Sequence, residues 1–508
     1  MFATVKSLVI NGIEAFPVQV EVDVQNGLPA FDLVGLPSAA IREAKERVRS
    51  AIKNSGFEFP LKRITVNLAP ADLRKEGTHL DLPIAMGILL AVEQIEATCD
   101  NMFWAGEVSL DGSVKGVPGI LPMILALSKR FPDGELLIPD ANQGEASILD
   151  YRCRLVPNLA DAVSYVRGDA SLPFLSNSDL GFHPGKYDVD LADIKGQAFA
   201  KRALEVAVAG GHNLLMVGPP GSGKTMLARR IPSIMPDMTK DEILETTQIY
   251  SVGGLLNTER PLITTRPFRA PHRNASAASI IGGGRIPRPG EISLAQHGVL
   301  FLDEVTEFSR EVLESLRQPL EDRTVTVTRA HSSSTYPCNM MLVAACNPCP
   351  CGYLGDSERS CNCTPTQVSR YFGRISGPLM DRMDLQVEVP RVPYEHLVSD
   401  SVQESSRDIK ARIEEVRRIQ TRRFSNRAGF TNARMKSRDL KMCCKLDEHA
   451  ESLLRSAFKS LKLSARGYDR VLKVARTVAD LSGSESIHQI HIAEAIQYRG
   501  IDRRYFSL

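Results

Sequence analysis

A glycine-rich loop that follows a short apolar run is the clearest candidate for chemistry in this sequence. Residues 218–225 read GPPGSGKT and come directly after LLMV at residues 214–217. Glycines let consecutive backbone N–H groups turn toward one phosphate, the lysine reaches the β- and γ-phosphates, and the threonine hydroxyl holds Mg²⁺. A helix that starts at the loop adds the positive end of its dipole. The pattern predicts a P-loop that binds ATP, with Lys224 on phosphate and Thr225 on Mg²⁺.

Two later apolar runs end in polar side chains that suit the same reaction. Residues 299–302 lead into Asp303 and Glu304, and residues 341–345 are followed by Cys346 and Asn347. Short apolar runs of this kind are typical of buried parallel strands. In a nucleotide hydrolase the first carboxylate orders Mg²⁺, the second polarises the attacking water, and the amide positions that water. Three such runs in this order predict an ATPase core.

Bulk composition indicates a multidomain protein without membrane or export signals. At 508 residues and a net charge of +2, the chain has room for about three domains, and any contact with nucleic acid must come from local patches. The longest apolar run, residues 82–92, covers about half a membrane span. The N-terminus lacks a signal-peptide pattern. We therefore expect a cytoplasmic protein whose ten cysteines are reduced or bound to metal.

The first 168 residues predict an α+β domain without a phosphate loop. Residues 18–24 alternate as a half-buried strand, residues 37–54 have the period of an amphipathic helix, residues 63–68 form another strand, and residues 82–92 a buried helix. Residues 169–188 are rich in Ser, Pro, Gly, Asn and Asp, which predicts a linker.

This first unit resembles the proteolytic domain of Lon proteases. Residues 75–79 (KEGTH) match the segment that carries the nucleophilic serine, and residues 106–110 with Gly119 match the segment leading to the catalytic lysine. The serine position falls on His79 and the lysine position on Leu121. A serine–lysine mechanism needs a hydroxyl and a nearby amine, so the resemblance implies a protease-like scaffold without that chemistry. We expect His79 and Asp81 to lie in a surface loop, with a cryptic site as the alternative.

Around the P-loop the sequence resembles the AAA+ superfamily, and residues 193–197 (DIKGQ) precede an alanine-rich helical segment. The resemblance implies that Ile194 and Gln197 contribute to the adenine pocket. Residues 267–291 predict a mobile basic loop, with a solvated connector as the alternative. Residues 324–329 predict a strand that turns back at His331 to form a hairpin.

The basic loop and the hairpin resemble the helix-2 insert and the pre-sensor hairpin of one AAA+ clade. That clade includes replicative minichromosome-maintenance helicases and magnesium chelatases. A ring-shaped motor moves DNA with central loops, and arginines there bind phosphates without reading bases. The predicted DNA-binding residues are Arg285, Arg288, Arg329 and His331.

Four cysteines after Asn347 form two Cys-x-Cys pairs: Cys349, Cys351, Cys361 and Cys363. Four thiolates suit tetrahedral zinc, and such a site is structural because no ligand position is left for water. A cysteine-rich loop without metal is the alternative.

Two arginines are candidates for completing the nucleotide site. By resemblance to the clade, Arg382 in residues 379–384 (LMDRMD) is an arginine finger that projects into the nucleotide of a neighbouring subunit. A salt bridge to Asp384 within the subunit is the alternative. Arg466 matches the second sensor arginine of the helical lid, with Arg470 as the competing assignment.

Residues 407–442 carry twelve Arg or Lys against four Asp or Glu, a local net charge of +8. This stretch is either a solvated helix face or a second phosphate-contacting surface.

In this order the modules resemble the bacterial ComM/YifB family of magnesium-chelatase-like AAA+ proteins. The resemblance covers nearly the whole chain and implies an α/β multidomain fold. Its parts are a Lon protease-like (S5-like) α+β domain at 1–168, a linker at 169–188, an AAA+ core with a parallel sheet at 189–392, and a C-terminal helical lid at 393–508. The core contains the helix-2 insert, the pre-sensor hairpin and the cysteine insertion.

The resemblance also implies an activity, namely ATP-driven branch migration of DNA by a homo-hexamer during integration of transforming DNA. Branched, single-stranded or double-stranded DNA would be the partner, with ATP, Mg²⁺ and structural Zn²⁺ as cofactors and no membrane contact. The sequence identifies no recombinase or loader. A magnesium chelatase-type regulatory ATPase and an ATP-dependent Lon-like protease are the alternatives. The predicted nucleotide-site residues are Ile194, Gln197, Gly218, Pro219, Pro220, Gly221, Ser222, Gly223, Lys224, Thr225, Met226, Asp303, Glu304, Asn347, Arg382 and Arg466.

Overall fold

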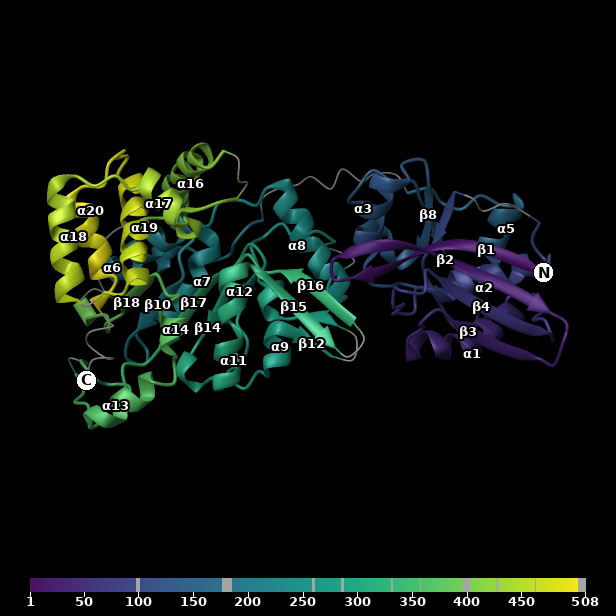
Figure 1. Cartoon of the computed structure of the whole chain (residues 1–508), viewed down its shortest axis with the longest axis horizontal. Coiled ribbons are helices and arrows are strands. Elements are labelled where there is room, and N and C mark those ends of the chain that lie inside the picture. The colour runs from purple at the N-terminus through teal and green to yellow at the C-terminus, as the bar shows by residue number, and fades with distance from the viewer. Residues whose placement is uncertain are drawn as a thin grey trace.

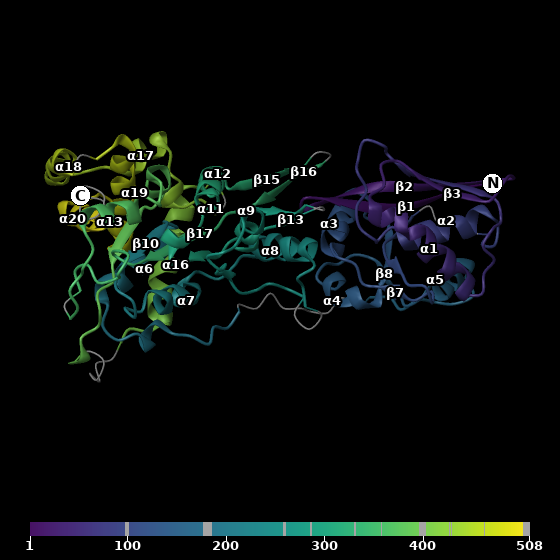
Figure 2. The ribbon, with the colours of Figure 1, turned by 90° about the horizontal axis from the view of Figure 1, so that it is seen from below.

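The computed structural model shows three parts arranged along the long axis of the molecule (Figure 1). An amino-terminal domain lies at one end, a central α/β unit follows, and carboxy-terminal helices lie at the other end; the view from below shows the same order (Figure 2). The structure describes residues 1–96, 101–175, 185–257, 261–284, 287–329, 332–356, 358–395, 403–425, 427, 429–461 and 463–500. Among these residues, no helix combines the length and apolarity needed to cross a bilayer.

The amino-terminal domain is built on a seven-stranded mixed sheet with the order β3-β4-β2-β1-β5-β8-β9. The long antiparallel pair β1–β2 extends toward the central unit (Figure 1). The strands are β1 (Phe2–Asn11), β2 (Glu14–Gln25), β3 (Ala30–Val34), β4 (Arg63–Ala69), β5 (Met102–Trp104), β8 (Glu135–Pro139) and β9 (Cys153–Val156), with a separate small pair β6 (Glu107–Val108) and β7 (Val114–Lys115).

The two helices that the sequence predicts in this domain are present as α1 (Ala39–Asn54) and α2 (Asp81–Ala91). α1 starts after Ser38, whose hydroxyl accepts from the backbone N–H of Ile41, and α2 is buried along nearly all of its length. The apolar core of the domain extends to Leu172 and Leu175, which lie beyond residue 168. The helices are α1 (Ala39–Asn54), α2 (Asp81–Ala91), α3 (Ile120–Arg130), α4 (Gln143–Ala146) and α5 (Leu159–Arg167).

The central unit contains a five-stranded parallel sheet with the order β11-β14-β17-β10-β18. Three of its strands are the three predicted apolar runs. All carboxyl ends of parallel strands meet at one edge, so the sheet brings the predicted polar tips together. The strands are β10 (Leu214–Val217), β11 (Phe268–Arg269), β14 (Val299–Leu302), β17 (Met341–Cys346) and β18 (Leu385–Glu388), flanked by α6 (Ala198–Gly210), α7 (Lys224–Ile234) and α8 (Lys240–Gly253).

Residues 267–291 contain short helices and strands that composition did not predict. Phe268 and Arg269 form edge strand β11, and Arg269 forms an ion pair with Glu291 at 2.6 Å, which ties the two ends of the insertion together. Between them lie α9 (Ala277–Ile281), a short ribbon of β12 (Gly282–Gly283) and β13 (Arg288–Pro289), and then α10 (Glu291–Leu294). The high glycine and proline content of this segment favoured a loop in the sequence analysis, so the pairing of β12 with β13 was not predicted.

The predicted hairpin is present as β15 (Thr324–Arg329) and β16 (Ser332–Pro337). It lies beside the amino-terminal domain in both ribbon views (Figures 1 and 2). Ser334 in β16 donates a hydrogen bond of 2.9 Å to Asn11 at the end of β1. Ser251 in α8 donates to Glu145 of the amino-terminal domain. Helix α8 and the hairpin therefore both contact the first domain.

The carboxy-terminal helices pack on the back of α6 and share one apolar core with the sheet. Most arginines of residues 407–442 with described partners are neutralised inside the chain: Arg412 pairs with Glu205 at 2.7 Å, Arg423 with Asp480 at 2.6 Å and Arg427 with Asp439 at 3.0 Å. Four short helices of the central unit follow β14: α11 (Arg310–Ser315), α12 (Arg317–Asp322), α13 (Pro365–Phe372) and α14 (Gly377–Met380). The carboxy-terminal helices are α16 (Ser406–Arg423), α17 (Ser437–Cys443), α18 (Glu448–Ser460), α19 (Ala465–Leu481) and α20 (Gln489–Gln497).

Candidate nucleotide site

The glycine loop connects β10 to α7 at the carboxyl edge of the parallel sheet. Gly221 and Gly223 have positive φ angles of 77° and 90°, which suit glycine. A side chain at Gly218 would place its Cβ 2.1 Å from the carbonyl oxygen of Val389, so glycine is required there for close packing. The N–H groups of Gly218 and Ser222 donate to the carbonyl oxygens of Cys346 at 3.2 Å and Pro219 at 3.3 Å, so a phosphate would be bound by other N–H groups of the loop.

Lys224 begins α7 and points back into the loop. Its Nζ donates to the carbonyl oxygens of Gly218 at 2.7 Å and Pro219 at 2.9 Å, and lies 3.5 Å from Oδ1 of Asn347. Burial lowers the pKa of this amine below its usual value. A buried ammonium held mainly by neutral carbonyl oxygens is suited to binding an anion such as a nucleotide phosphate.

The predicted magnesium ligands lie side by side. Thr225 Oγ1 donates to Asp303 Oδ2 at 2.7 Å, although 77 positions separate them along the chain. Their proximity follows from the strand order, because β10 and β14 flank β17. A hydroxyl and a carboxylate at a phosphate loop match the hard oxygen ligands that Mg²⁺ prefers. These residues therefore fit the predicted ion.

Glu304 is already engaged by the basic insertion. Its Oε2 lies 2.5 Å from Nη1 of Arg273, and both side chains are about half exposed (49% each). Glu304 also adopts a left-handed backbone conformation with φ of 50°, which directs the chain sharply away from the strand tip. The sequence did not single out Arg273: it is one of several arginines in the insertion, and no spacing rule links it to Glu304.

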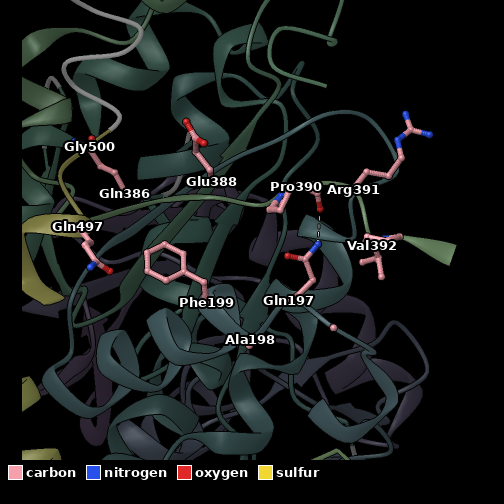
Figure 3. A pocket seen from close by; sticks show the side chains of 12 residues that line it. Gln197, Ala198, Phe199, Gln386, Glu388, Pro390, Arg391, Val392, Gln497 and Gly500 are labelled. Carbon is pink, nitrogen blue, oxygen red and sulfur yellow. Dashed lines mark hydrogen bonds between the residues drawn. The ribbon is translucent and has the colours of Figure 1, made fainter. Parts of the chain in front are cut away.

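A cavity of about 690 Å³ lies beside the P-loop (Figure 3). Gln197 lines it, and its Nε2 donates to the carbonyl oxygens of Pro390 at 2.5 Å and Ser222 at 3.3 Å. Ile194, the other predicted adenine contact, is buried in the apolar core and is not among the lining residues. Phe199 and Arg391 line the cavity instead. An apolar ring and backbone carbonyls at this position suit a flat base.

The four predicted zinc ligands come together after β17. Their sulfur atoms all lie within 4.8 Å of one another, with 3.3 Å between Cys349 and Cys351 and 3.6 Å between Cys349 and Cys361. A tetrahedral zinc with bonds of about 2.3 Å separates its sulfurs by about 3.8 Å. The cluster therefore fits one zinc ion after small adjustments.

Arg382 lies at the opposite edge of the sheet from the P-loop. Its carbonyl oxygen accepts from Asn213 Nδ2 at 3.0 Å, directly before β10 begins, whereas the P-loop follows the end of β10. The guanidinium donates to Glu321 and to Pro378 O at 2.5 Å. Its predicted alternative partner, Asp384, is used by Arg470 at 3.3 Å and by His212 at 3.4 Å.

Arg466 is exposed at the start of α19. Burial lowers the pKa of Arg382 against the opposing effect of Glu321, and the nearby charges of Arg317 and Arg466 add to the lowering. Arg470 is largely buried against Asp384, which gives it a structural contact within the chain. Of these two arginines Arg466 is the one presented to solvent. A strand of four residues spans about 13 Å, so the backbone of Arg382 lies at the far end of β10 from the P-loop of its own chain.

The candidate DNA residues are only partly described. Arg288 is exposed in β13. Arg285, His331 and the side chain of Arg329 lie outside the described residues. Their predicted role stays a prediction.

The protease-like segment differs from the expected surface loop. His79 is buried, and its Nε2–H donates to the carbonyl oxygen of Leu8 at 2.8 Å; burial lowers its pKa to about 4. Asp81 is also buried and pairs with Arg47 at 2.7 Å. Leu121 is buried in α3. The surface-loop expectation was wrong because these residues pack under β1 and against α1. Neither His79 nor Leu121 supplies the hydroxyl or the amine of a serine–lysine pair.

The fold and the site define a class. A parallel sheet with a P-loop after one strand, Asp-Glu after a second, Asn after a third and a helical unit behind α6 is the arrangement of an AAA+ ATPase. Family comparison agrees: residues 190–397 match "Magnesium chelatase, subunit ChlI", residues 20–142 match "Subunit ChlI of Mg-chelatase", and residues 403–499 match "Magnesium chelatase, subunit ChlI C-terminal".

Full-length relatives narrow the class to a family. Competence protein ComM of Haemophilus influenzae is 46% identical over 99% of this chain and 98% of its own length. Protein YifB of Escherichia coli is 42% identical over 98% of this chain and 97% of its own length. A shorter match, 29% identical over 28% of this chain and 27% of its own length, is to Lon protease 2 of Bacillus subtilis. The chain belongs to the ComM/YifB family of magnesium-chelatase-like AAA+ proteins, and this membership implies ATPase activity.

Proposed function

We propose that the protein is a homo-hexameric, ATP-driven DNA motor, a branch migration helicase that acts on recombination intermediates when transforming DNA is integrated. A relative that is 46% identical along the chain bears the name competence protein. The ATPase core supplies the energy source. Loops at the DNA-facing side of such a core would convert nucleotide state into movement of the strand.

One observation carries this proposal: the ion pair of 2.5 Å between Arg273 and Glu304. It joins the basic insertion to the carboxylate assigned to the attacking water. DNA phosphates near the insertion compete with Glu304 for the guanidinium of Arg273, because both are oxyanions that bind arginine. Binding of DNA therefore favours release of Glu304 toward the nucleotide, and hydrolysis becomes coupled to occupancy by DNA.

In that reaction the residues of this chain have distinct tasks. Lys224 exchanges the carbonyl oxygens of Gly218 and Pro219 for phosphate oxygens. Thr225 and Asp303 would hold Mg²⁺, which neutralises phosphate charge. Glu304 polarises the attacking water by accepting a hydrogen bond from it, and the side-chain amide of Asn347 positions that water. Each of these side chains lies at the carboxyl edge of the sheet, so small shifts there reach the insertion directly.

The proposal of a ring rests on the position of the two arginines. Arg382 lies next to Asn213, at the sheet edge opposite to the P-loop of its own chain, and Arg466 is close enough for its charge to lower the pKa of Arg382. A second copy whose P-loop faces this edge would receive both guanidinium groups, which is the arrangement of a site completed in trans. Repetition of such a head-to-tail contact closes into a ring when its rotation allows.

The test measures DNA affinity and DNA-stimulated ATPase activity in variants of the insertion and hairpin. Arg285→Ala, Arg288→Ala or Arg329→Ala should weaken DNA binding and reduce the magnitude of the salt slope by about one for each lost phosphate contact. Basal ATPase activity and assembly should be retained. The matched control is Arg455→Ala, which removes an exposed arginine side chain from α18. Equal losses in Arg455→Ala, or normal DNA binding in all three loop variants, would contradict the motor assignment.

A regulatory ATPase of the magnesium chelatase type is the second candidate, favoured by the three family matches that carry that name. It predicts ATPase activity that DNA does not change. Measuring the ATPase rate with and without branched DNA at physiological salt separates the two functions.

A further inference from the structure

A cavity of about 370 Å³ lies behind the sheet, at the edge opposite to the P-loop. The cavity is lined by Gly298 and Met341, where β14 and β17 begin, and by residues of the carboxy-terminal part of the chain such as Phe430. The cavity is therefore separate from the nucleotide pocket of the same chain. It connects the ATPase core with the helices that follow it.

Four arginines line this cavity, and only one has a carboxylate partner among the described residues. Arg266 pairs with Glu242 at 3.2 Å. The other acidic side chain at the wall, Asp237, is taken by Lys410 at 2.5 Å. The remaining arginines are Arg323, Arg417 and Arg434.

In the described part of the chain, the hydrogen bonds of these three guanidinium groups go to neutral carbonyl oxygens, and Arg434 also lies over the ring of Phe430 at 5.3 Å from its centroid. Arg323 Nη1 donates to Met340 O at 2.7 Å, and Arg417 Nη2 donates to Val208 O at 2.8 Å. Arg434 Nη1 makes a long contact of 3.4 Å with Gly429 O. Among the described residues, the buried Nε of Arg417 has no hydrogen-bond partner. A buried polar group left in this state costs free energy, so its retention requires a compensating contact.

The electrostatics agree with the geometry. Burial lowers the pKa of Arg417 to about 10, and the nearby charge of Arg266 adds to the effect. Burial also lowers the pKa of Arg323, with a further contribution from Arg434. Guanidinium groups that repel one another in a desolvated cavity are stabilised by an anion between them. Threonine hydroxyls at the wall, Thr239 and Thr431, offer further donors.

We propose that this cavity is an anion-binding site for a phosphate group, formed by Arg323, Arg417 and Arg434. A phosphate dianion offers enough oxygens to accept from several guanidinium groups at once, as arginine clusters require. Arg323 immediately precedes β15, so the site lies at the base of the hairpin. Arg417 and Arg434 belong to the carboxy-terminal half. A bound phosphate therefore braces that half against the base of the hairpin.

The test titrates inorganic phosphate into full-length protein carrying Lys224→Ala, which removes the lysine that binds phosphate in the P-loop. Calorimetry at constant ionic strength should show one site per chain. Adding Arg417→Gln should weaken phosphate binding roughly tenfold or more, the scale of one buried charged hydrogen bond. Adding Arg418→Gln instead should leave it unchanged; this neighbour on α16 is exposed and pairs with Glu415. Absence of phosphate binding, or equal affinity in both variants, would overturn the proposal.

A second variant separates ligand loss from misfolding. Arg434→Gln removes one of the repelling charges, so its melting temperature in chloride buffer should equal or exceed that of the parent. In phosphate buffer its gain in melting temperature should be smaller than that of the parent. A melting temperature that falls by the same amount in both buffers would show that Arg434 has only a packing role, and would also overturn the proposal.

The source of the phosphate is decided by competition. A short single-stranded oligonucleotide with a 5′-phosphate should displace inorganic phosphate if the site receives a DNA end, and the same oligonucleotide with a 5′-hydroxyl should not. If neither displaces it, the site takes free phosphate. Both results are compatible with the phosphate site and differ only in what delivers the group.

Discussion

Gly352 of the cysteine loop lies directly against Pro220 of the P-loop, so closely that a Cβ at Gly352 would sit 2.8 Å from the Cδ of Pro220. The cysteine loop also anchors Arg391 of the nucleotide cavity through Asp356, at 3.3 Å. The proposed zinc ion would therefore support the nucleotide site from two sides without touching the nucleotide.

We predict one zinc ion per chain and a coupling between zinc and ATP affinity. Protein purified without chelator should contain close to one equivalent of zinc by elemental analysis. Cys361→Ser should lose the metal and weaken ATP binding several-fold, because the loop beneath Pro220 loosens. Cys443→Ser is the matched control, since Cys443 lies outside the cluster in α17. Folded, reduced protein without metal would leave the metal-free cysteine loop as the correct interpretation.

We predict that Glu304→Gln separates ATP binding from hydrolysis. The amide retains the size of the side chain but loses the charge that orients water, so turnover should fall by about two to four orders of magnitude while ATP binding stays near normal. Lys224→Ala should instead weaken ATP binding itself. Filter binding and a phosphate-release assay measure the two effects. Near-normal turnover in Glu304→Gln would show that another group orients the water.

We predict that Arg273→Ala raises basal ATPase activity and reduces its stimulation by DNA. Removing an exposed ion pair worth at most about 1 kcal/mol frees Glu304, so the basal rate should rise by up to about fivefold. Arg374→Ala, which breaks a similar exposed pair with Glu307 at 3.1 Å, should leave both rates unchanged. A collapse of the basal rate in Arg273→Ala would mean that Arg273 assists the reaction and does not restrain it.

We predict that Arg382 acts on the nucleotide of a neighbouring chain. Arg382→Ala and Glu304→Gln proteins should each be nearly inactive alone. Mixed in one assembly they should regain part of the activity, because some interfaces then join an intact Arg382 to an intact Glu304. Light scattering confirms that the mixture assembles. Lack of any recovery at every mixing ratio, with assembly intact, would assign both residues to the same site.

The sequence predicted the strands of the nucleotide core because each is a short apolar run with a polar tip, as residues 299–304 illustrate. It also predicted the cysteine cluster, since spacing within one loop fixes which thiols can meet. It did not predict the partner of Glu304. That contact depends on how the insertion folds over the strand tip, and Arg273 carries no local pattern that distinguishes it from Arg269.

The sequence also failed to predict which polar residues of the first domain are buried. His79 and Asp81 follow Gly77 in a polar stretch, which favours a loop by composition. Their burial results from β1, which passes over them from the far end of the domain. Ile194 lies in the apolar core, and its assignment to the adenine pocket by resemblance stays a prediction. Contacts between distant segments decided each of these outcomes.

The hydrogen bond between Ser334 and Asn11 shows that the hairpin packs against the first domain. A chain cut before residue 185 would uncover the side of β16 that now faces β1, together with Val252 and Tyr336 at the seam. Loss of activity in such a fragment would therefore report a hairpin that has lost its support, whatever the ancestral chemistry of the missing domain. Point changes at Asn11, which leave that surface covered, are the cleaner means of learning what the domain contributes.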